Sequence, residues 1–448
     1  MRLLFTIPEY PPHSGGGIGT FYAQFLPQLV TQGHEVTVLV ANPFSGEFEG
    51  YSEAGVTVSC VPKGAIAAQM SAFAHYASLP ELQRSLATAW AAWEFIKGGQ
   101  KFDAVETTDW GLTFVPWIVS PEAPPTVIQL HGSMGQIDFY DPQLDKPVQG
   151  RLIRLIETGC FAVADALQSN SPSNAHYWQA LIHREVDYLP PALALPHAEN
   201  LIESDSNTGA KSGAGVVVGR IQHWKGPAVL CEALQLLGDR APGMVWIGRD
   251  TVYGQSGTFM SDWLAQQYPN LWRKKVQCVG TLSPQETRRH QREAAFTVVP
   301  SLWDVFNFTS AEGMACGQIV LCSEGAGATA LIESGVNGFR FAANDPQALA
   351  ETLERCLALS PAERTKMQQA AQDTIRTLLD PERVAYQRSE AYAKLMHHGR
   401  WQTPPQEWLR EATTPRPFSG NPLAFLDALP LQPLVRYVFR RSLKKLWR

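Results

Sequence analysis

The feature that most constrains the fold is a strand-like run that leads into a glycine turn and then a helix-like stretch, which occurs twice in the chain. The first copy has the apolar run 3–7, bounded by Pro8, and the glycines 15–17. The second copy has the apolar run 216–218 and Gly219. Short apolar runs of this kind are typical of strands buried on both faces of a parallel sheet. We therefore expect two α/β domains, each with its own parallel sheet.

The rest of each half alternates between strand-like and helix-like segments. Strand-like segments lie at 36–40, 56–60, 102–105, 126–130, 244–247, 276–279, 296–299 and 319–322, and helix-like stretches at 81–97 and 228–237. Between the halves, residues 191–214 are rich in Pro, Ser and Gly, as linkers are. The sequence predicts doubly wound Rossmann-like domains at 1–190 and 215–381, which face each other across a cleft at the carboxyl ends of their strands.

Length and composition agree with two domains and exclude several classes of protein. At 448 residues the chain is too long for one hydrophobic core. Its content of 45% hydrophobic and 18% charged residues excludes a disordered chain. A net charge of −5 gives no general attraction to nucleic acid. The seven cysteines include no Cys-x-x-Cys pair, so neither a zinc site nor a disulfide framework is indicated. No apolar span reaches membrane length, and we expect a cytoplasmic protein.

The first glycine turn suits either a ligand-binding loop or a plain tight turn. Glycines at a helix N-terminus let the backbone approach a phosphate group. The spacing does not fit the dinucleotide fingerprint, because Thr20 or Tyr22 occupies the third glycine position and Asn42 stands where an acid would bind a ribose. The pattern therefore argues against a dehydrogenase, and leaves anion binding and an unliganded turn as equal alternatives.

Two cations flank the second glycine turn. Gly219 and Arg220 close a strand, and Lys225 and Gly226 follow before a helix. A guanidinium and an ammonium on one loop suit a diphosphate, with about 1.5–3 kcal/mol for each charge-assisted hydrogen bond. Solvated surface charges are the alternative. The position at the carboxyl end of a strand favours ligand binding.

A third pattern follows the strand-like run 296–299. Asp304 and Glu312 are separated by seven residues and are followed by Gly313-Met-Ala-Cys-Gly317. This resembles the donor site of the retaining glycosyltransferases of family 4, whose signature is Glu, seven residues and Glu, then Ala-Met-Ala-x-Gly. Further motifs follow in the family's order: Pro11-Pro12, Gly16-Gly17-Ile18-Gly19, Gly33-His34-Glu35-Val36, His131-Gly132, Gly219-Arg220 with Lys225-Gly226, Gly280 to Glu286, and Gly335 to Gly338. The resemblance covers about residues 1–396. It implies the GT-B fold, with a terminal helix at 382–396 that returns to the first domain.

The resemblance also implies a role for each matched residue. Arg220 and Lys225 would neutralise the leaving nucleoside diphosphate in place of a metal ion. Asp304 would contact the donor sugar, and His131 would lie across the cleft near the sugar and the acceptor. The nucleotide-sugar site would further include Gly16, Gly17, Gly219, Thr281, Leu282, Phe306, Asn307, Phe308 and Glu312. Among these, Glu312 would accept hydrogen bonds from the ribose, and the residues from 306 to 308 would offer backbone N–H groups at a helix start.

The implied reaction moves a hexose from a nucleotide diphosphate sugar to a glycan, lipid-linked or small hydroxyl acceptor, with retention and without a cofactor. In a front-face substitution the departing phosphate oxygen takes the acceptor's proton, so no separate base is required. However, Asp304 replaces the family's first Glu, Asn307 a usual Gly and Ala330 a frequent Glu. These departures keep open the alternative of a sugar-nucleotide-binding protein with weak or no activity. Two other GT-B enzymes, a nucleotide-sugar epimerase and an inverting transferase, are also alternatives.

Beyond residue 397 the resemblance ends. Several Trp and Pro residues suggest an irregular stretch on the surface, followed from about 431 by a helix. This helix would have an apolar band and no acid, with cations every four residues at Arg436, Arg440, Lys444 and Arg448. Such a pattern is typical of a helix at an anionic membrane surface, and a helix docked on the first domain is the alternative. Peripheral contact with the inner face of the membrane through 431–448 is therefore a hypothesis.

Overall fold

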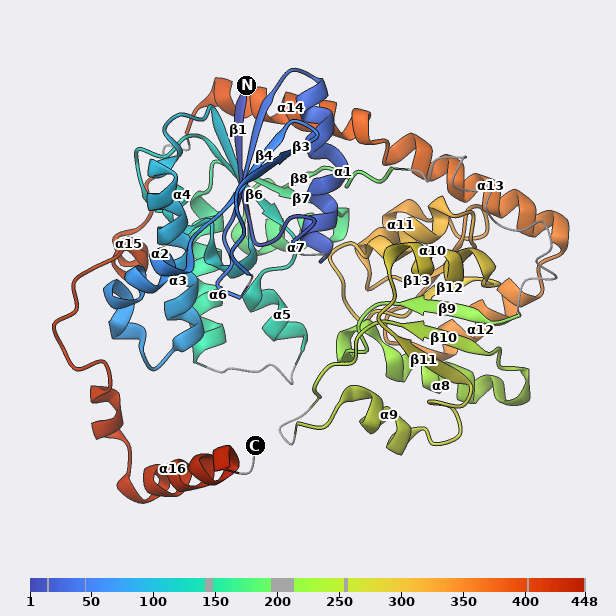
Figure 1. Ribbon diagram of the computed structural model, residues 1–448. Helices are drawn as coiled ribbons and strands as arrows, with labels where there is room; N and C mark the ends of the chain where they lie inside the picture. Colours follow the sequence, from blue (N-terminus) through green and yellow to red (C-terminus); the bar gives the residue numbers. More distant parts are fainter. Residues whose placement is uncertain are drawn as a thin grey trace.

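The computed structural model describes residues 1–13, 16–44, 46–141, 148–194, 213–253, 257–400 and 403–446. Two α/β domains lie side by side, one around an eight-stranded sheet and the other around a six-stranded sheet (Figure 1). At the end of the second domain, one long helix lies over that domain and the next crosses the top of the first (Figure 1). The predicted fold class, two parallel-sheet α/β domains, is confirmed.

The first sheet has its earliest strand near the centre. Its strands are β1 (Arg2–Ile7), β2 (Glu35–Val40), β3 (Tyr51–Glu53), β4 (Val56–Cys60), β5 (Ala104–Thr108), β6 (Thr126–Leu130), β7 (Ala166–Ser169) and β8 (Asp187–Tyr188). Their spatial order is β3-β4-β2-β1-β5-β6-β7-β8, and β3 alone runs antiparallel to its neighbour. The order reverses between β1 and β5. In doubly wound sheets, ligands bind outside the carboxyl ends of the strands at such a reversal.

The second sheet repeats this arrangement. Its strands are β9 (Gly215–Val218), β10 (Met244–Ile247), β11 (Val276–Gly280), β12 (Thr297–Val299), β13 (Val320–Ser323) and β14 (Phe339–Phe341). All neighbours are parallel, in the order β11-β10-β9-β12-β13-β14. The order reverses between β9 and β12, so the second sheet also offers a ligand position beside its first strand.

Helices cover both faces of each sheet. Those of the first domain are α1 (Gly17–Thr31), α2 (Lys63–Met70), α3 (Pro80–Phe95), α4 (Val115–Val119), α5 (Met134–Tyr140), α6 (Gln149–Val163) and α7 (Pro172–Ile182). Those of the second are α8 (Pro227–Leu237), α9 (Met260–Gln267), α10 (Pro284–Glu293), α11 (Phe308–Ala315), α12 (Pro346–Leu357) and α13 (Pro361–Leu378). Helices α3 and α6 pack on one face of the first sheet, and α1 on the other. In the second domain α8 and α12 share one core, and α11 and α13 another.

The predicted strands match the observed ones closely, with one instructive difference. β4, β6 and β10 have the predicted bounds. β5 was expected at 102–105 but runs over Ala104–Thr108 and continues through buried Glu106. The strand lies between β1 and β6, so its backbone is paired on both sides, and the Glu106 carboxylate accepts a hydrogen bond from the Tyr392 hydroxyl at 2.6 Å. The short strands β3, β7, β8 and β14 were not predicted.

The helix that returns to the first domain is α14 (Pro381–His398). It packs on α1, and its Arg388 is fully buried. The Arg388 guanidinium donates to Gln129 at 3.1 Å and to Gln168 at 3.2 Å, and lies 3.5 Å from Glu106. A buried cation from the last helix of the family-like region therefore ties that helix to three strands of the first sheet.

The two segments outside the domains differ from expectation in detail. Of the predicted linker 191–214, residues 195–212 lie outside the described residues. The tail expected to be irregular contains α15 (Glu407–Thr413), which docks on the first domain. Trp90 Nε1 donates to the Thr413 carbonyl at 2.7 Å.

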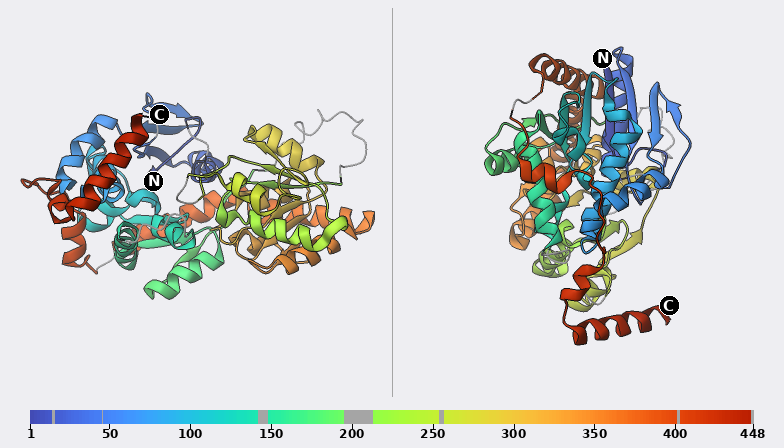
Figure 2. Two further views of the ribbon diagram at one scale, coloured as in Figure 1. Left: turned by 90° about the horizontal axis from the view of Figure 1, so that it is seen from below. Right: turned by 90° about the vertical axis from the view of Figure 1, so that its left-hand side faces the viewer.

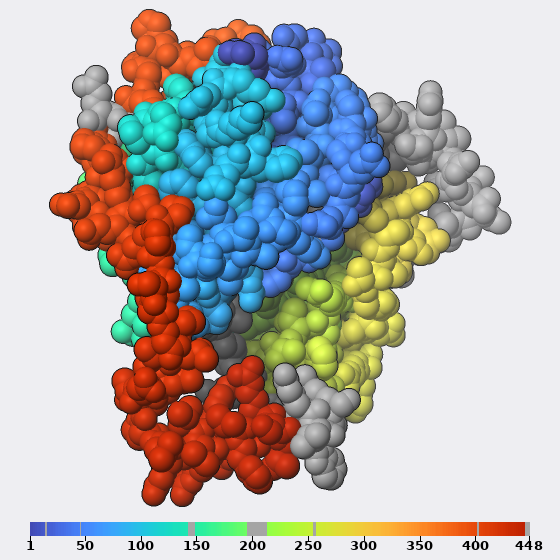
Figure 3. All heavy atoms as spheres, turned by 60° about the vertical axis from the view of Figure 1, so that its left-hand side comes forward, coloured from blue at the N-terminus to red at the C-terminus, as the bar shows by residue number. Residues whose placement is uncertain are grey.

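The chain ends in α16 (Leu431–Leu446), which stands clear of both domains (Figure 2). The tail runs down one side of the first domain before it reaches α16 (Figure 3). Among the described helices, none is long and apolar enough to cross a bilayer.

Candidate active site

The loops that follow β6 and β12 meet at the boundary between the two domains. Trp303, after β12, stacks on Tyr140 at the end of α5, with ring centroids 4.5 Å apart and planes 5° from parallel. A Cβ added to Gly132, after β6, would lie 3.3 Å from the rings and methyls of Trp303 and Val305. The carboxyl ends of strands from both sheets thus converge, which is where this architecture places ligands.

Three of the residues singled out from the sequence form one cluster on the second-domain side of this boundary. Lys225 Nζ lies 2.5 Å from Asp304 Oδ2, and the two side chains are 19% and 18% exposed. Asn307 Nδ2 donates to the same oxygen at 2.9 Å. The backbone of Asp304 is fixed because its N–H donates to the Gly325 carbonyl and its carbonyl accepts from the Gly327 N–H. Asp304 therefore holds a defined position with a cation beside it.

The position of Lys225 depends on a glycine. Lys225 ends the short 3-10 helix η6 (His223–Lys225), and Gly226 follows with a φ of +72°. A Cβ on Gly226 would overlap the carbonyl oxygen of Pro300, so only glycine lets the η6 loop pack on the loop after β12. The same contact is strengthened by the N–H of Leu302, which donates to the Trp224 carbonyl at 2.7 Å. Gly226 thus brings Lys225 within reach of Asp304.

Arg220 lies beside this cluster, next to Trp224. It follows Gly219, whose φ is +151°, and its guanidinium lies 5.9 Å from the ring centroid of Trp224. The side chain is exposed overall, yet nearby protein atoms and the charge of Arg249 lower its pKa, while Asp304 and Glu9 act in the opposite direction. Since Glu9 belongs to the first domain, charges of both domains act on Arg220.

Helix α11 begins at the same place. Its N-cap Asn307 has a φ of +77°, a left-handed conformation that Asn and Gly adopt most readily, which explains why Asn can replace the usual Gly here. Asn307 Oδ1 accepts from the Ser310 N–H at 3.3 Å. Within the described part of the chain, the backbone N–H groups of Phe306, Asn307 and Phe308 have no acceptor. These donors, beside Lys225, suit the oxygens of a diphosphate.

The remaining donor-site candidates lie around α11 and α10. Glu312 is partly buried on α11, and burial raises its pKa while the charge of Arg288 opposes the rise. Thr281 is exposed after β11, and Leu282 packs against a small core on the sheet. Their contacts to a nucleotide stay predictions.

Gly16 and Gly17 open α1 on the first-domain side. The Glu9 carboxylate accepts from the N–H groups of Ile18 at 3.1 Å and Gly19 at 3.0 Å. A Cβ on Gly16 would overlap this carboxylate. Two N–H groups of the α1 N-terminus are therefore occupied by a side chain of the protein itself. The contact of Gly16 and Gly17 with donor phosphates stays a prediction.

His131 is held by its backbone. Its N–H donates to Asp109 Oδ1 at 2.9 Å, and the N–H of Gly132 donates to Asp109 Oδ2 at 3.0 Å. Asp109 is fully buried, and this burial raises its pKa to about 7 despite the two hydrogen bonds. The loop after β6 is thus fastened to the end of β5.

The imidazole ring of His131 is neutral and has, among the described residues, one nitrogen without a partner. Asn170 Nδ2 donates to His131 Nδ1 at 3.3 Å, and the orientation of the Asn170 amide is fixed because its Oδ1 accepts from Gln129. The proton of the ring therefore lies on Nε2, which is buried and unpaired within the described residues. Burial, and secondarily the charge of Arg388, lowers the pKa of His131 to about 3. His131 can donate a hydrogen bond but cannot supply a positive charge at neutral pH.

Sequence reasoning missed Glu9, Asp109, Trp303 and Arg388. Asp109 directly follows β5, but the predicted strand ended at residue 105, so its place at the end of a strand was not recognised. Arg388 had no usable signal, since its partners are more than 200 positions away in the chain. Within the described residues, no three His, Cys, Asp or Glu side chains are grouped as a metal site requires.

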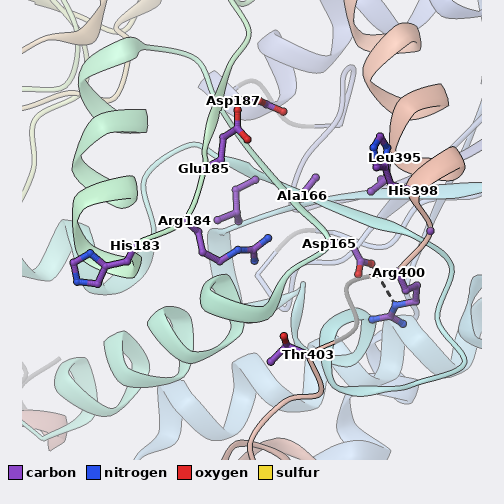
Figure 4. A pocket seen from close by; sticks show the side chains of 12 residues that line it. Asp165, Ala166, His183, Arg184, Glu185, Asp187, Leu395, His398, Arg400 and Thr403 are labelled. Atoms are coloured by element: carbon purple, nitrogen blue, oxygen red, sulfur yellow. Dashed lines mark ion pairs between the residues drawn. The ribbon is translucent and has the colours of Figure 1, made fainter.

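A cavity of about 660 Å³ lies elsewhere, at the amino ends of β7 and β8 (Figure 4). Its two arginines serve the fold: Arg184 donates to the carbonyls that end α6, and Arg400 donates to those after α4 and pairs with Asp165 at 3.3 Å. Because it is at the opposite ends of the strands from His131, the cavity is not part of the candidate site.

Comparison with known families identifies the class of protein. Residues 16–191 match the glycosyl transferase 4-like domain, and residues 214–358 match the glycosyl transferases group 1. The two matches coincide with the two sheets that meet at the site. The chain belongs to the group 1 glycosyltransferases of family 4 type, as its resemblance implied.

Individual relatives agree with this class. The D-inositol 3-phosphate glycosyltransferase of Nocardiopsis dassonvillei is 33% identical over 173 residues, which cover 36% of this chain and 38% of that protein. The sucrose-phosphate synthase of Thermosynechococcus elongatus has a similar structure, with a TM-score of 0.70 and 18% identity over 89% of this chain and all (100%) of that one. The Anabaena protein HepE, in complex with UDP-glucose, superposes with a TM-score of 0.62 and 16% identity over 88% of this chain and 100% of that one. These structures show the GT-B fold.

Proposed function

We propose that this protein transfers a hexose from a nucleotide diphosphate sugar to a hydroxyl acceptor, with retention of configuration at the anomeric carbon. The observation that carries the proposal is the cluster of Lys225, Asp304 and the free N–H groups at the start of α11, which faces the His131 loop across the domain boundary. A cation, a fixed carboxylate and aligned backbone donors are what a sugar diphosphate requires from a protein.

Each group has a distinct task in this reaction. Lys225 and Arg220 would neutralise the negative charge that builds on the departing diphosphate, and the N–H groups of Phe306 to Phe308 would add hydrogen bonds to the same oxygens. We therefore propose that no metal ion is needed for this step. Asp304 would accept hydrogen bonds from the donor sugar. The unpaired Nε2–H of His131 would donate to a hydroxyl of the sugar.

The bond changes follow a front-face substitution. The bond between the anomeric carbon and the diphosphate oxygen breaks, and the acceptor oxygen forms a bond to the same face of that carbon. The acceptor's proton passes to the departing diphosphate oxygen. No base on the protein is needed for this step.

The relatives indicate which substrates to test first. HepE binds UDP-glucose, so UDP-glucose is the first donor. The Nocardiopsis relative acts on D-inositol 3-phosphate, so this compound is the first small acceptor, ahead of glycans and lipid-linked sugars.

The test has two stages. A thermal-shift screen of UDP, GDP, ADP and their sugars identifies the donor, because a ligand at 100 times its Kd adds about 2.7 kcal/mol to stability. Proton NMR of the product then gives the anomeric configuration, with and without EDTA. Retention in EDTA supports the proposal. An inverted product, an epimerised donor sugar, or tight donor binding without turnover over the acceptor panel would each assign the protein to one of the three alternatives.

A further inference from the structure

Helix α16 is amphipathic and has no partner among the residues that the structure describes. None of its residues from 431 to 443 belongs to a hydrophobic core of either domain. Its large apolar side chains are exposed, including Leu431 at 73%, Val435 at 57% and Phe439 at 64%. Figure 2 shows the helix projecting away from the body on an extended segment. A folded protein rarely exposes so many apolar side chains together without a binding partner.

The two faces of α16 differ in chemistry. At 100° per residue, Leu431, Val435, Val438 and Phe439 lie on one stripe, about a third of the circumference wide. Arg440 points from the opposite side, and Arg436 and Arg441 each lie about 110° from the middle of the stripe, one on either side; all three are exposed.

The positive charge of α16 indicates that its partner is an anionic surface. The last acid of the chain is Asp427, so the helix is purely cationic, and the six cations from Arg436 to Arg448 leave a formal charge of −11 on the rest of the protein. A negative body is repelled by an anionic surface, and the helix is the one segment of the described tail whose charge and apolar face both favour such a surface.

The length of α16 shows whether it could cross a bilayer or would lie at the bilayer surface. A helix of 16 residues spans about 24 Å, less than the roughly 30 Å core of a bilayer, and its cations would be buried if it crossed. It suits the plane of the interface, with the apolar stripe among the acyl chains and the arginines among the headgroups.

The attachment of α16 leaves it free to reach a surface. The tail is anchored to the first domain through α15 and through the Arg416 N–H, which donates to the Ala72 carbonyl at 3.3 Å. Between that anchor and α16, the side chains of Leu423, Phe425 and Leu429 are also exposed. In Figure 1, α16 lies on the opposite side of the first domain from α14, where the two domains are joined.

We propose that α16 binds the surface of an anionic lipid bilayer and holds the two domains beside it. The helix lies in the plane of the membrane, and the domains do not insert. The proposal does not rest on the identity of the donor or acceptor, because it concerns a segment outside both sheets.

Charge variants of the full-length chain test this directly. The protein is sedimented with vesicles of phosphatidylcholine and phosphatidylglycerol, or of phosphatidylcholine alone. Replacing Arg436, Arg440 and Arg441 together by Gln should weaken binding to the mixed vesicles about 100-fold, at about fivefold per cation. Binding of the unaltered protein should also fall steeply between about 0.1 and 1 M salt, as the screening length shortens from about 10 to 3 Å. Vesicle binding that the triple variant retains in full would overturn the proposal.

A matched control separates the helix from general charge effects. Lys101, Lys274 and Lys366 are exposed on the two domains. Their joint replacement by Gln removes the same charge and should leave vesicle binding within about twofold, since the bulk of the protein is kept away from the surface. An equal loss in this control would show that the whole protein, and not α16, senses the lipid.

Apolar variants test insertion. Val435→Ser with Phe439→Ser should lower binding at least tenfold, whereas Val336→Ser with Leu357→Ser, at similarly exposed sites on the second domain, should not change it. The melting temperature of the α16 variants should equal that of the unaltered protein, because α16 supports no described core. A drop in melting temperature for the α16 pair alone would mean that the helix docks on the protein. Lipid-free dimers that the α16 pair abolishes, without vesicle binding by the unaltered chain, would assign the helix to self-association instead.

Discussion

Replacing Lys225 with Ala tests whether this lysine serves a ligand or only its neighbour Asp304. The structure places Nζ 2.5 Å from Asp304 Oδ2, on the loop that precedes α8. If Lys225 donates to the departing diphosphate, its loss removes one donor to charge that develops in the transition state. We expect kcat/KM to fall by about 10²–10³, equivalent to about 2.7–4 kcal/mol.

The expected cost in stability is much smaller. The two side chains are 19% and 18% exposed, so water can solvate the Asp304 carboxylate, and Asn307 still donates to it. The free energy of unfolding in urea should fall by about 1 kcal/mol. Lys274→Ala is the matched control, because Lys274 is an exposed lysine of the same domain, and it should change either quantity by less than about 0.5 kcal/mol.

A double-mutant cycle distinguishes the two roles of Lys225. In an Asp304→Asn background there is no carboxylate for Lys225 to pair with. If Lys225 serves only Asp304, replacing Lys225 in this background should have no further effect. A lysine that binds phosphate should still raise the Kd for the nucleoside diphosphate, measured by calorimetry, about tenfold when it is replaced. An unchanged Kd in both backgrounds, or a loss of stability as large as the loss of activity, would refute the reasoning.

Three further outcomes follow from the structure. Arg388→Ala should lower the free energy of unfolding in urea by about 3–5 kcal/mol, because it strands the buried carboxylate of Glu106; a loss below about 1 kcal/mol would contradict that burial. Gly226→Ala should cost more than about 2 kcal/mol and Gly335→Ala about 1, since both have positive φ but only the first would press a Cβ onto a backbone oxygen; equal costs would argue against the close contact. The folded-state pKa of His131, about 3, lies below its ordinary 6.5, so its contribution to stability is present above pH 6.5 and is lost as the pH falls toward 3. The difference in unfolding free energy between the unaltered protein and His131→Asn should therefore shrink by up to about 1.4 kcal/mol per pH unit from pH 6 to 4, and a constant difference would mean that the ring is charged in the fold.

Part of the candidate site could be predicted from the sequence, and part could not. Lys225, Asp304 and Asn307 were singled out by their spacing, and the structure brings them together because they follow neighbouring parallel strands, whose carboxyl ends share one edge of a sheet. His131 was found for the same reason on the first sheet. The fastening of its loop by Asp109 was not, because the predicted strand stopped three residues short of Thr108.

By itself, the sequence determined the presence of two sheets, the place of most of their apolar strands, the loops at the carboxyl ends of those strands and an amphipathic last helix, because these features depend on periodicity and on the spacing of neighbouring residues. Only the tertiary structure decided that Trp303 stacks on Tyr140, that Glu9 occupies the start of α1, that Arg388 is buried among three strands, and that α16 rests on neither domain. Contacts between residues far apart in the chain, and the absence of a contact for a given helix, depend on how the elements pack together. No local pattern of residues carries that information.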